Sequence, residues 1–165
     1  MSDVNEDFST LDKVLVRMEE WKKADSSAYN EAYVSLCLHK MIAPLVTLQL
    51  LFWNPLEDHS NIEDMDWHNR VALYAHNLDL NKEDNMFLSL VLEKVVLVKI
   101  INMVKAAYDP LSTSQTTRLR ELIVKLRNTY PTLTGSSKQV KELLTSVIDK
   151  FKASIGKFSK RLILL

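Results

Sequence analysis

The sequence predicts an all-α fold, a single-domain array of about seven antiparallel helices. Apolar residues recur at helical spacing over most of the 165 residues, and no segment alternates with period two over the length of a strand. Two glycines and four prolines leave little material for tight hairpins and bulges. The composition, 47% hydrophobic and 25% charged, is that of a globular domain, so residues 1–165 are expected to form one domain excised from a longer protein.

The first half of the chain predicts two helices and an apolar stretch. The first helix begins near Ser9 or Thr10, and Asp25 ends it and caps the next. Pro44 predicts a bend or a new helix start, and the apolar stretch 45–53 is expected to be almost wholly buried. The residues of the second helix that are expected to point inward are Tyr29, Tyr33, Leu36, Cys37 and Leu38.

The second half predicts a short helix, a long central one and two more. The short helix covers roughly 64–78 and follows an acidic loop. The helix over 85–108 is apolar nearly all round, which predicts a central element, and its interspersed charges argue against a membrane span. The helix after it is expected to bury Leu119, Leu122, Ile123 and Leu126. The last helix has the cleanest period, in Val140, Leu143, Leu144, Val147, Ile148, Phe151 and Ile155.

An aromatic-Asx-Pro-Leu signal occurs twice, as Trp53-Asn54-Pro55-Leu56 and as Tyr108-Asp109-Pro110-Leu111. Proline pushes the preceding residue out of the α region, so Asn54 and Asp109 are expected to end their helices, each after an aromatic that is the last helical residue. The repetition suggests two related helical units stacked like a solenoid.

Two segments are candidates for binding. The residues Ser112, Thr113, Gln115 and Thr116 are natural helix caps, and the alternative is a polar docking edge or a phosphorylation site at a helix N-terminus. The C-terminal helix is more apolar than a chain end needs, which predicts a partner-facing surface formed by Phe151, Ile155, Phe158 and Leu162. An oligomer contact, or the edge of a larger fold, would leave the same pattern.

Other chemistries find little support. His68 and His76 do not complete a zinc ligand set, so neither a metal nor a cofactor is expected. Cys37, between two leucines, is expected to be a buried small hydrophobe. No nucleophile, base and orienting group come together, so an enzyme is not expected. Twenty-one basic residues balance twenty-one acidic ones, which is no nucleic-acid footprint, although RNA backbone contacts stay open.

The same residues carry a family resemblance. The stretches SLCLHKMIAPLVTLQLLFWNPLE and VLEKVVLVKIINMVKAAYDPLSTSQTTRL closely resemble the GCF C-terminal-type domain of GC-rich sequence DNA-binding factor, of the Pax-binding protein branch and, more distantly, of tuftelin-interacting protein. The resemblance covers roughly residues 15–130. The matching positions are Leu38, Lys40, Pro44, Leu45, Gln49, Leu50, Trp53, Pro55, Leu56, Asp109, Pro110, Leu111, Ser112, Thr113, Gln115 and Thr116.

The resemblance implies a nuclear, non-enzymatic scaffold of the pre-mRNA splicing machinery. It would act at the late intron-lariat stage by docking a tuftelin-interacting-protein-like partner, and through it a DEAH-box helicase. The alternative is a transcription regulator that binds DNA or RNA. Oligomeric state stays open.

Overall fold

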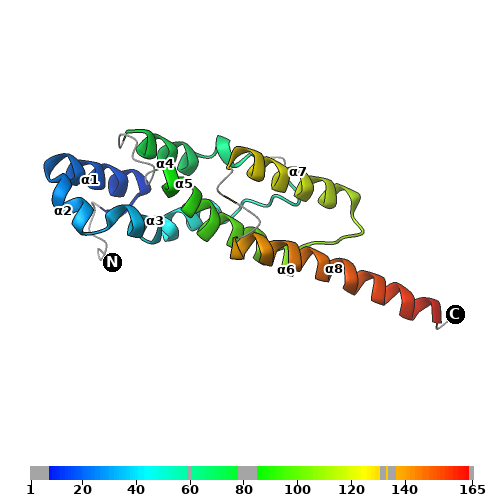
Figure 1. The fold of residues 1–165 in the computed structure, drawn as a ribbon. Coiled ribbons are helices and arrows are strands. Elements are labelled where there is room, and N and C mark those ends of the chain that lie inside the picture. Colours follow the sequence, from blue (N-terminus) through cyan, green and yellow to red (C-terminus); the bar gives the residue numbers. More distant parts are fainter. Residues whose placement is uncertain (1–7, 59–60, 78–84, 131–132, 134–136, 164–165) are drawn as a thin grey trace, which may run out of the picture. The chain divides into compact units, whose positions relative to one another are not determined.

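A computed structural model describes residues 8–58, 61–77, 85–130, 133 and 137–163, without the side chains of Asn85, Met86 and all residues after Gly156. Every regular element in this part of the chain is a helix, which confirms the all-α prediction (Figure 1). Because α5, η3 and α6 follow one another without a break, the described α-helical segments number seven. The elements are α1 (Leu11–Ala24), α2 (Ser26–Glu31), α3 (Val34–Gln49), the 3₁₀ turn η2 (Ile62–Asp64), α4 (Asp66–Asn77), α5 (Asn85–Val91), the π-helical segment η3 (Leu92–Val96), α6 (Leu97–Ala107), α7 (Thr113–Thr129) and α8 (Lys138–Ile163).

The chain divides into two compact units, each with buried apolar residues of its own. Unit 1 consists of Met1–Phe52 and Asn61–Val95, and unit 2 of Trp53–Ser60 and Val96–Leu165. The first division follows the end of α3, and the last falls inside η3. That residues 1–165 act as one domain stays a prediction.

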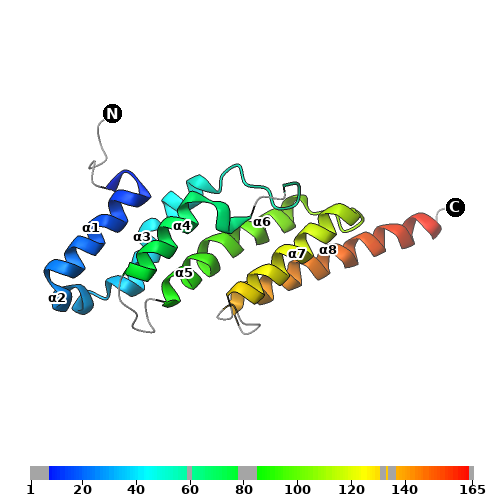
Figure 2. The same ribbon diagram turned by 90° about the horizontal axis from the view of Figure 1, so that it is seen from above.

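Unit 1 has an aromatic core. Helix α5 packs against both α3 and α4 (Figure 2). Trp67 and Tyr29 are fully buried, and the hydroxyls of Tyr29 and Tyr74 lie 2.9 Å apart, so each of these buried polar groups has a partner. Gln49 at the end of α3 accepts a hydrogen bond from the Trp67 backbone N–H at 3.1 Å, which ties α3 to the start of α4.

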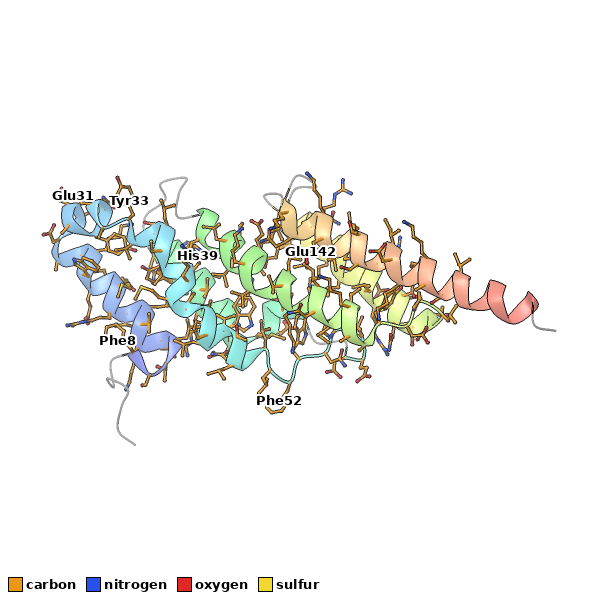
Figure 3. The ribbon with its side chains drawn as sticks, turned by 90° about the horizontal axis from the view of Figure 1, so that it is seen from below. Phe8, Glu31, Tyr33, His39, Phe52 and Glu142 are labelled. Carbon is orange, nitrogen blue, oxygen red and sulfur yellow. The ribbon has the colours of Figure 1, made fainter. Side chains whose placement is uncertain are left out.

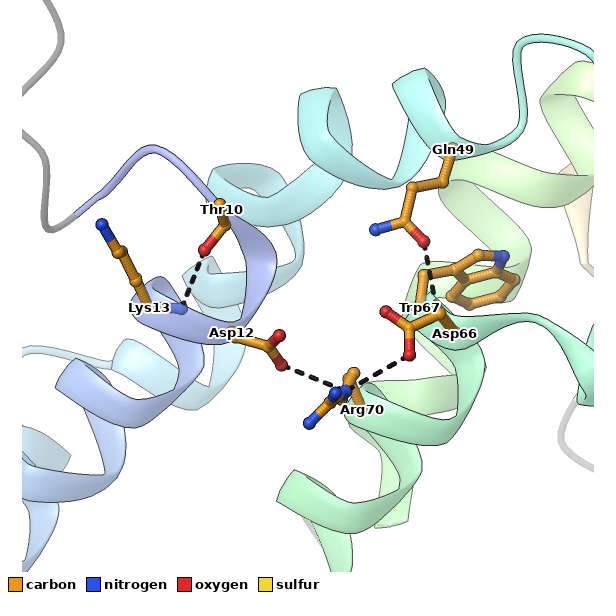
Figure 4. Close-up of polar contacts among 7 residues, drawn as sticks. All are labelled: Thr10, Asp12, Lys13, Gln49, Asp66, Trp67 and Arg70. Atoms are coloured by element: carbon orange, nitrogen blue, oxygen red, sulfur yellow. Dashed lines mark hydrogen bonds and ion pairs between the residues drawn. The ribbon is translucent and has the colours of Figure 1, made fainter.

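Helix α1 begins and ends, and α2 begins, as predicted. Thr10 caps α1, with its hydroxyl accepting from the Lys13 N–H at 3.3 Å, and Asp25 ends α1 and caps α2 by accepting from the Ala28 N–H at 2.9 Å. Arg70 on α4 reaches Asp12 on α1 at 3.2 Å (Figure 4). Side-chain caps therefore define the boundaries, and an exposed ion pair joins α1 to α4.

Tyr33 changes the direction in which α3 points its side chains. Its backbone is left-handed, with φ 52°, and it separates α2 from α3. The predicted continuous helix would bury Tyr33, Leu36 and Cys37, but all three are exposed, and of the expected inward set only Tyr29 and Leu38 are buried. Because a left-handed residue interrupts the α-helical path, the helical phase counted from Tyr29 no longer applies after it.

Of the two alternatives predicted at Pro44, the new helix start is wrong, since Pro44 lies inside α3, and the bend stays a prediction. The stretch 45–53 is not wholly buried either. Val46, Leu50 and Trp53 are buried, but Leu48 and Leu51 are exposed and Phe52 is 91% exposed (Figure 3). One side of α3 packs on α1, α2 and α5, which leaves the apolar residues of its other side toward solvent.

Unit 2 is organised around the pair α6 and α8, which pack along each other. Ile100, Ile101 and Val104 are buried on α6, as the central-element prediction requires. On α7, Leu119 and Leu126 are buried, whereas Leu122 and Ile123 are half-buried. The periodic apolar residues of α8 divide between two sides: Leu143 is buried, whereas Leu144, Ile148, Phe151 and Ile155 are exposed.

Candidate protein-interaction site

The first Asx-Pro-Leu turn is a buried anchor of unit 2. The Leu56 N–H donates to Asn54 Oδ1 at 3.1 Å, and the Asp58 N–H donates to the Asn54 carbonyl at 2.8 Å. Trp53, Pro55 and Leu56 are buried. An Asx side chain that bonds the N–H two residues on makes a compact turn.

This turn does not end a helix, contrary to the prediction. Helix α3 stops at Gln49, before Trp53 and Asn54. The Leu51 N–H bonds back three residues to the Leu48 carbonyl at 3.2 Å, which tightens the last turn of the helix and ends it early. The Asn54-Pro55-Leu56 signal therefore predicts the turn correctly, but it does not predict the residue at which α3 ends.

The second turn is held by a denser network. Tyr108 follows the last residue of α6 as its C-cap, is buried, and lies with its hydroxyl 2.9 Å from Thr116 Oγ1. Asp109 accepts from the Leu111 N–H at 3.0 Å through Oδ1, and its own N–H donates to Gln115 Oε1 at 2.9 Å.

Ser112 caps α7, as predicted, by accepting from the Gln115 N–H at 3.4 Å. Helix capping and turn bonding therefore account for Asp109, Ser112, Gln115 and Thr116, while Leu111 and Thr113 remain exposed.

The two turns share one geometry and are joined. Asn54 and Asp109 each accept from the N–H of the leucine two residues on, so both make the same Asx turn. Arg118 on α7 donates to the Leu56 carbonyl at 3.1 Å, which connects the helix after the second turn to the first turn. The signal repeats in structure as well as in sequence at these two places. Whether either turn docks a partner stays a prediction.

A groove of about 530 Å³ adjoins the second turn. It lies between the C-terminal end of α6 and the middle of α8, and both walls carry charge: Lys105 and Asp109 from one side, Asp149 and Lys150 from the other. Nearby, Lys105 Nζ contacts Glu142 Oε1 at 2.6 Å, and this hydrogen bond, reinforced by the ammonium charge, lowers the pKa of the Glu142 carboxyl. The contact joins α6 to α8.

The predicted partner-facing surface is partly within the described region. Phe151 and Ile155 are exposed on α8, and Phe151 also makes an edge contact with Tyr108 at 6.3 Å between ring centroids. The side chains of Phe158 and Leu162 lie outside the described residues. Leu144 and Ile148 extend the same exposed side toward the start of α8.

Sequence reasoning missed a second exposed apolar side, on α3. Cys37, Met41, Pro44 and Leu48 are exposed and follow one another at intervals of four, three and four residues, which places them on one side of α3. Leu51 and Phe52, which follow the end of α3, are also exposed, and Phe52 is labelled in Figure 3. The prediction of almost complete burial for 45–53 missed this side, because an apolar stretch does not tell which of its residues the rest of the chain covers.

The histidines of the described residues differ in burial. His39 is buried, and burial, aided by the nearby charges of Lys40 and Lys94, lowers its pKa, against a smaller opposing effect of the Leu36 carbonyl. His68 is buried, His76 is exposed, and His59 lies outside the described residues. Within the described residues, no group of three or more His, Cys, Asp and Glu side chains is placed to hold a metal ion. Cys37 is exposed rather than buried, because Tyr33 has reset the helix phase.

None of the helices in the described part of the chain combines the length and the apolar content that crossing a membrane requires.

Comparison with known proteins places this arrangement in a family. The model of the family described as "GC-rich sequence DNA-binding factor-like protein" matches residues 11–86. The chain is 33% identical over 162 residues to mouse "Intron Large complex component GCFC2". The matched region covers 93% of this chain and 21% of that protein.

Two further relatives are similar. Human "PAX3- and PAX7-binding protein 1" is 34% identical over 138 residues, which cover 81% of this chain and 15% of that protein. Arabidopsis thaliana "Transcriptional repressor ILP1" is 30% identical over 152 residues, 89% of this chain and 16% of that protein. The chain thus spans about a fifth or less of the length of these relatives. Because the family model matches residues 11–86 and relatives that are 33% and 34% identical cover 93% and 81% of this chain, the chain belongs to the GC-rich sequence DNA-binding factor-like (GCFC) family.

Proposed function

We propose that this chain is a non-enzymatic protein-interaction scaffold of the pre-mRNA splicing machinery in the nucleus. The observation that carries the proposal is the exposed apolar side of α8, where Leu144, Ile148, Phe151 and Ile155 form a continuous stripe. A stripe of this kind on a helix suits the helix-against-helix packing of protein complexes. The name of the mouse relative, an Intron Large complex component, supports a splicing setting.

The partner we propose is a tuftelin-interacting-protein-like splicing factor, with a DEAH-box helicase reached through it, at the late intron-lariat stage. The resemblance of the turn segments to the GCF C-terminal-type domain supports this choice. In the mechanism, the partner packs on the outer side of α8. The second Asx-Pro-Leu turn holds the chain that leads into α7, and the Lys105–Glu142 contact links α8 to α6.

The test is a pull-down from nuclear extract with residues 1–165 as bait, at low and high salt and with nuclease. The variant Ile148→Ser/Ile155→Ser removes apolar area from the stripe, since these side chains are 51% and 67% exposed. Val124→Ser, an exposed apolar residue on α7, is the matched control. We expect the parent and the control to recover the splicing factor at high salt after nuclease treatment, and the double variant to lose it.

A second function, binding of DNA or RNA in transcription control, is favoured by the name of the Arabidopsis relative and by the cations that follow Asp149 in α8. Phosphate contacts release counterions, so such binding weakens steeply as salt rises. Recovery of nucleic acid alone, lost at high salt, would replace the scaffold function with this one.

A further inference from the structure

The stripe on α8 has the spacing of a coiled-coil seam. Leu144, Ile148, Phe151 and Ile155 are separated by four, three and four residues, which is the alternation of a heptad repeat. In the sequence, Phe158 and Leu162 continue at intervals of three and four. The pattern averages 3.5 residues, which keeps a seam facing one partner helix along its length.

The seam is distinct from the side of α8 that packs inside unit 2. Leu143 and Ser146 are buried on that inner side, and α6 is the helix that packs against α8. Phe151 is 39% exposed even though its ring contacts Tyr108, so it borders both sides. The described helices of unit 2 thus leave the seam open while they cover the inner side.

The charges along the C-terminal half of α8 have one sign. From Lys150 to the end of the sequence there are five cations, Lys150, Lys152, Lys157, Lys160 and Arg161, and no Asp or Glu. Lys152 is exposed and lies one residue after Phe151 of the seam, in a position that flanks the seam of a heptad. Glu142, the preceding acid apart from Asp149, is already bonded to Lys105.

We propose that the α8 seam binds an amphipathic helix of a partner protein whose flanking positions are acidic. The inference rests on the proposed scaffold function and specifies the chemistry of its partner. Apolar residues of the partner would pack between Ile148 and Ile155, and its carboxylates would pair with cations such as Lys152. Opposite charges at the flanking positions of a coiled coil select the partner and its orientation.

The alternative occupants fit less well. A second copy of α8 would bring two cationic helices together, and the like charges that flank the two seams would repel each other. A nucleic-acid strand would use the cations but not the aliphatic seam, because unpaired bases stack on aromatic rings. The whole chain has a formal net charge of zero, so the positive charge that attracts an acidic partner belongs to this helix and not to the molecule as a whole.

The experiment measures binding of a fluorescent synthetic helix to the full chain by anisotropy. The probe has about four heptads with Leu at the seam positions and Glu at the flanking ones, and a second probe carries Lys in place of Glu. We expect the parent chain to bind the Glu probe. Its affinity for the Lys probe should be lower by about tenfold or more, and so should the affinity of the Ile148→Ser/Ile155→Ser variant for the Glu probe. Val124→Ser should bind like the parent, and Lys152→Glu should weaken the Glu probe and strengthen the Lys probe.

Circular dichroism melting establishes that each variant remains folded before its affinity is compared. Equal binding of the two probes would overturn the acidic-partner inference. So would parent-like binding by the double variant, dimers in sedimentation experiments that the double variant abolishes, or binding of RNA but not of either probe. These results differ from failure of the scaffold function itself, which would appear as no splicing factor recovered from nuclear extract by the parent chain.

Discussion

Helix α3 of unit 1 and helix α8 of unit 2 share an unusual property. Both are apolar on two sides, of which one is packed and the other faces solvent. Their charges differ. From Ala32 to Leu56 the sequence has no acid and a single cation, Lys40, whereas α8 has only cations after Asp149. Apolar area supplies adhesion on either helix, but only the charges of α8 define what kind of partner fits.

The units also differ in how they use polar groups. Unit 1 pairs the Tyr29 and Tyr74 hydroxyls inside an aromatic core, while unit 2 has several side-chain hydrogen bonds at the turn between α6 and α7. Removal of a core side chain should therefore be costly in unit 1, and removal of a cap should be costly in unit 2.

The largest expected effect comes from Trp67→Ala in unit 1. The indole is fully buried, so its loss should lower the free energy of unfolding by about 3–5 kcal/mol. Leu48→Ala, on the outer side of α3 and 65% exposed, should change it by less than about 1 kcal/mol. Urea unfolding followed by circular dichroism measures both. A similar cost for the two variants would break the division of unit 1 into packed and open sides.

In unit 2, Ser112→Ala removes the cap of α7 and should cost about 1 kcal/mol. The exposed Thr113 begins α7 and provides no cap, so Thr113→Ala is the control and should be nearly neutral. Thermal melting compares the two, and hydrogen exchange should show the loss in the first turn of α7. A melting temperature of Ser112→Ala equal to that of the parent would contradict the capping role of Ser112.

A smaller effect is expected at Tyr33, which is left-handed and 68% exposed. Glycine adopts this backbone without the steric cost that an L side chain carries, so Tyr33→Gly should be more stable than Tyr33→Ala by about 1 kcal/mol. Because both variants lose the same ring, the difference isolates the backbone. Equal stability in chemical denaturation would mean that position 33 does not set the phase of α3 in solution.

The smallest expected effect is the pH dependence from His39, a single group in unit 1. Its folded pKa is lowered from the ordinary 6.5, chiefly by burial, so the unfolded chain binds the proton more readily. The stability that the neutral form provides is therefore complete above about pH 6.5 and is lost as pH falls through the unfolded pKa toward the folded one.

The measurement for His39 is the free energy of unfolding across that pH range, for the parent and for His39→Gln. The difference in free energy of unfolding between the parent and His39→Gln should narrow as pH falls, because only the parent loses the stability that neutral His39 provides. Parallel curves would show that folding does not change the pKa of His39.

Much of the fold follows from local signals. Caps at Thr10, Asp25 and Ser112 were predictable because short polar side chains bond free helix N–H groups within a few residues. The all-α class followed from helical spacing and from the scarcity of glycine and proline. Each of these signals acts within one or two turns, so no knowledge of tertiary packing is needed.

The errors concern events that local patterns do not encode. A left-handed Tyr33 carries no glycine or asparagine signature, so the phase change in α3 was invisible, and Cys37 and Leu36 were assigned to the wrong side. Pro44 is accommodated inside α3, which its type argues against. An all-apolar helix indicates contact on every side, but it does not say whether the same chain or a partner provides it, which is why the open side of α3 was missed.

The candidate site was predictable in part for the same reason. The apolar surplus of the last helix predicted an outer surface at Phe151 and Ile155, and both are exposed, whereas their contact with a partner stays a prediction. Their extension to Leu144 and Ile148 required the structure, since only the packing of α6 shows which of the periodic residues on α8 are already covered.

Site-specific photo-crosslinking tests the central claim, that the open side of α8 contacts a partner protein, most directly. A photoreactive phenylalanine analogue replaces Ile155 on α8, Leu48 on α3 or Val124 on α7, all exposed, and the chain is irradiated in nuclear extract with nuclease. We expect crosslinks from position 155 to an acidic helical segment of a splicing factor, and none from position 124. Crosslinks from position 155 only to nucleic acid or to another copy of this chain would contradict the central claim.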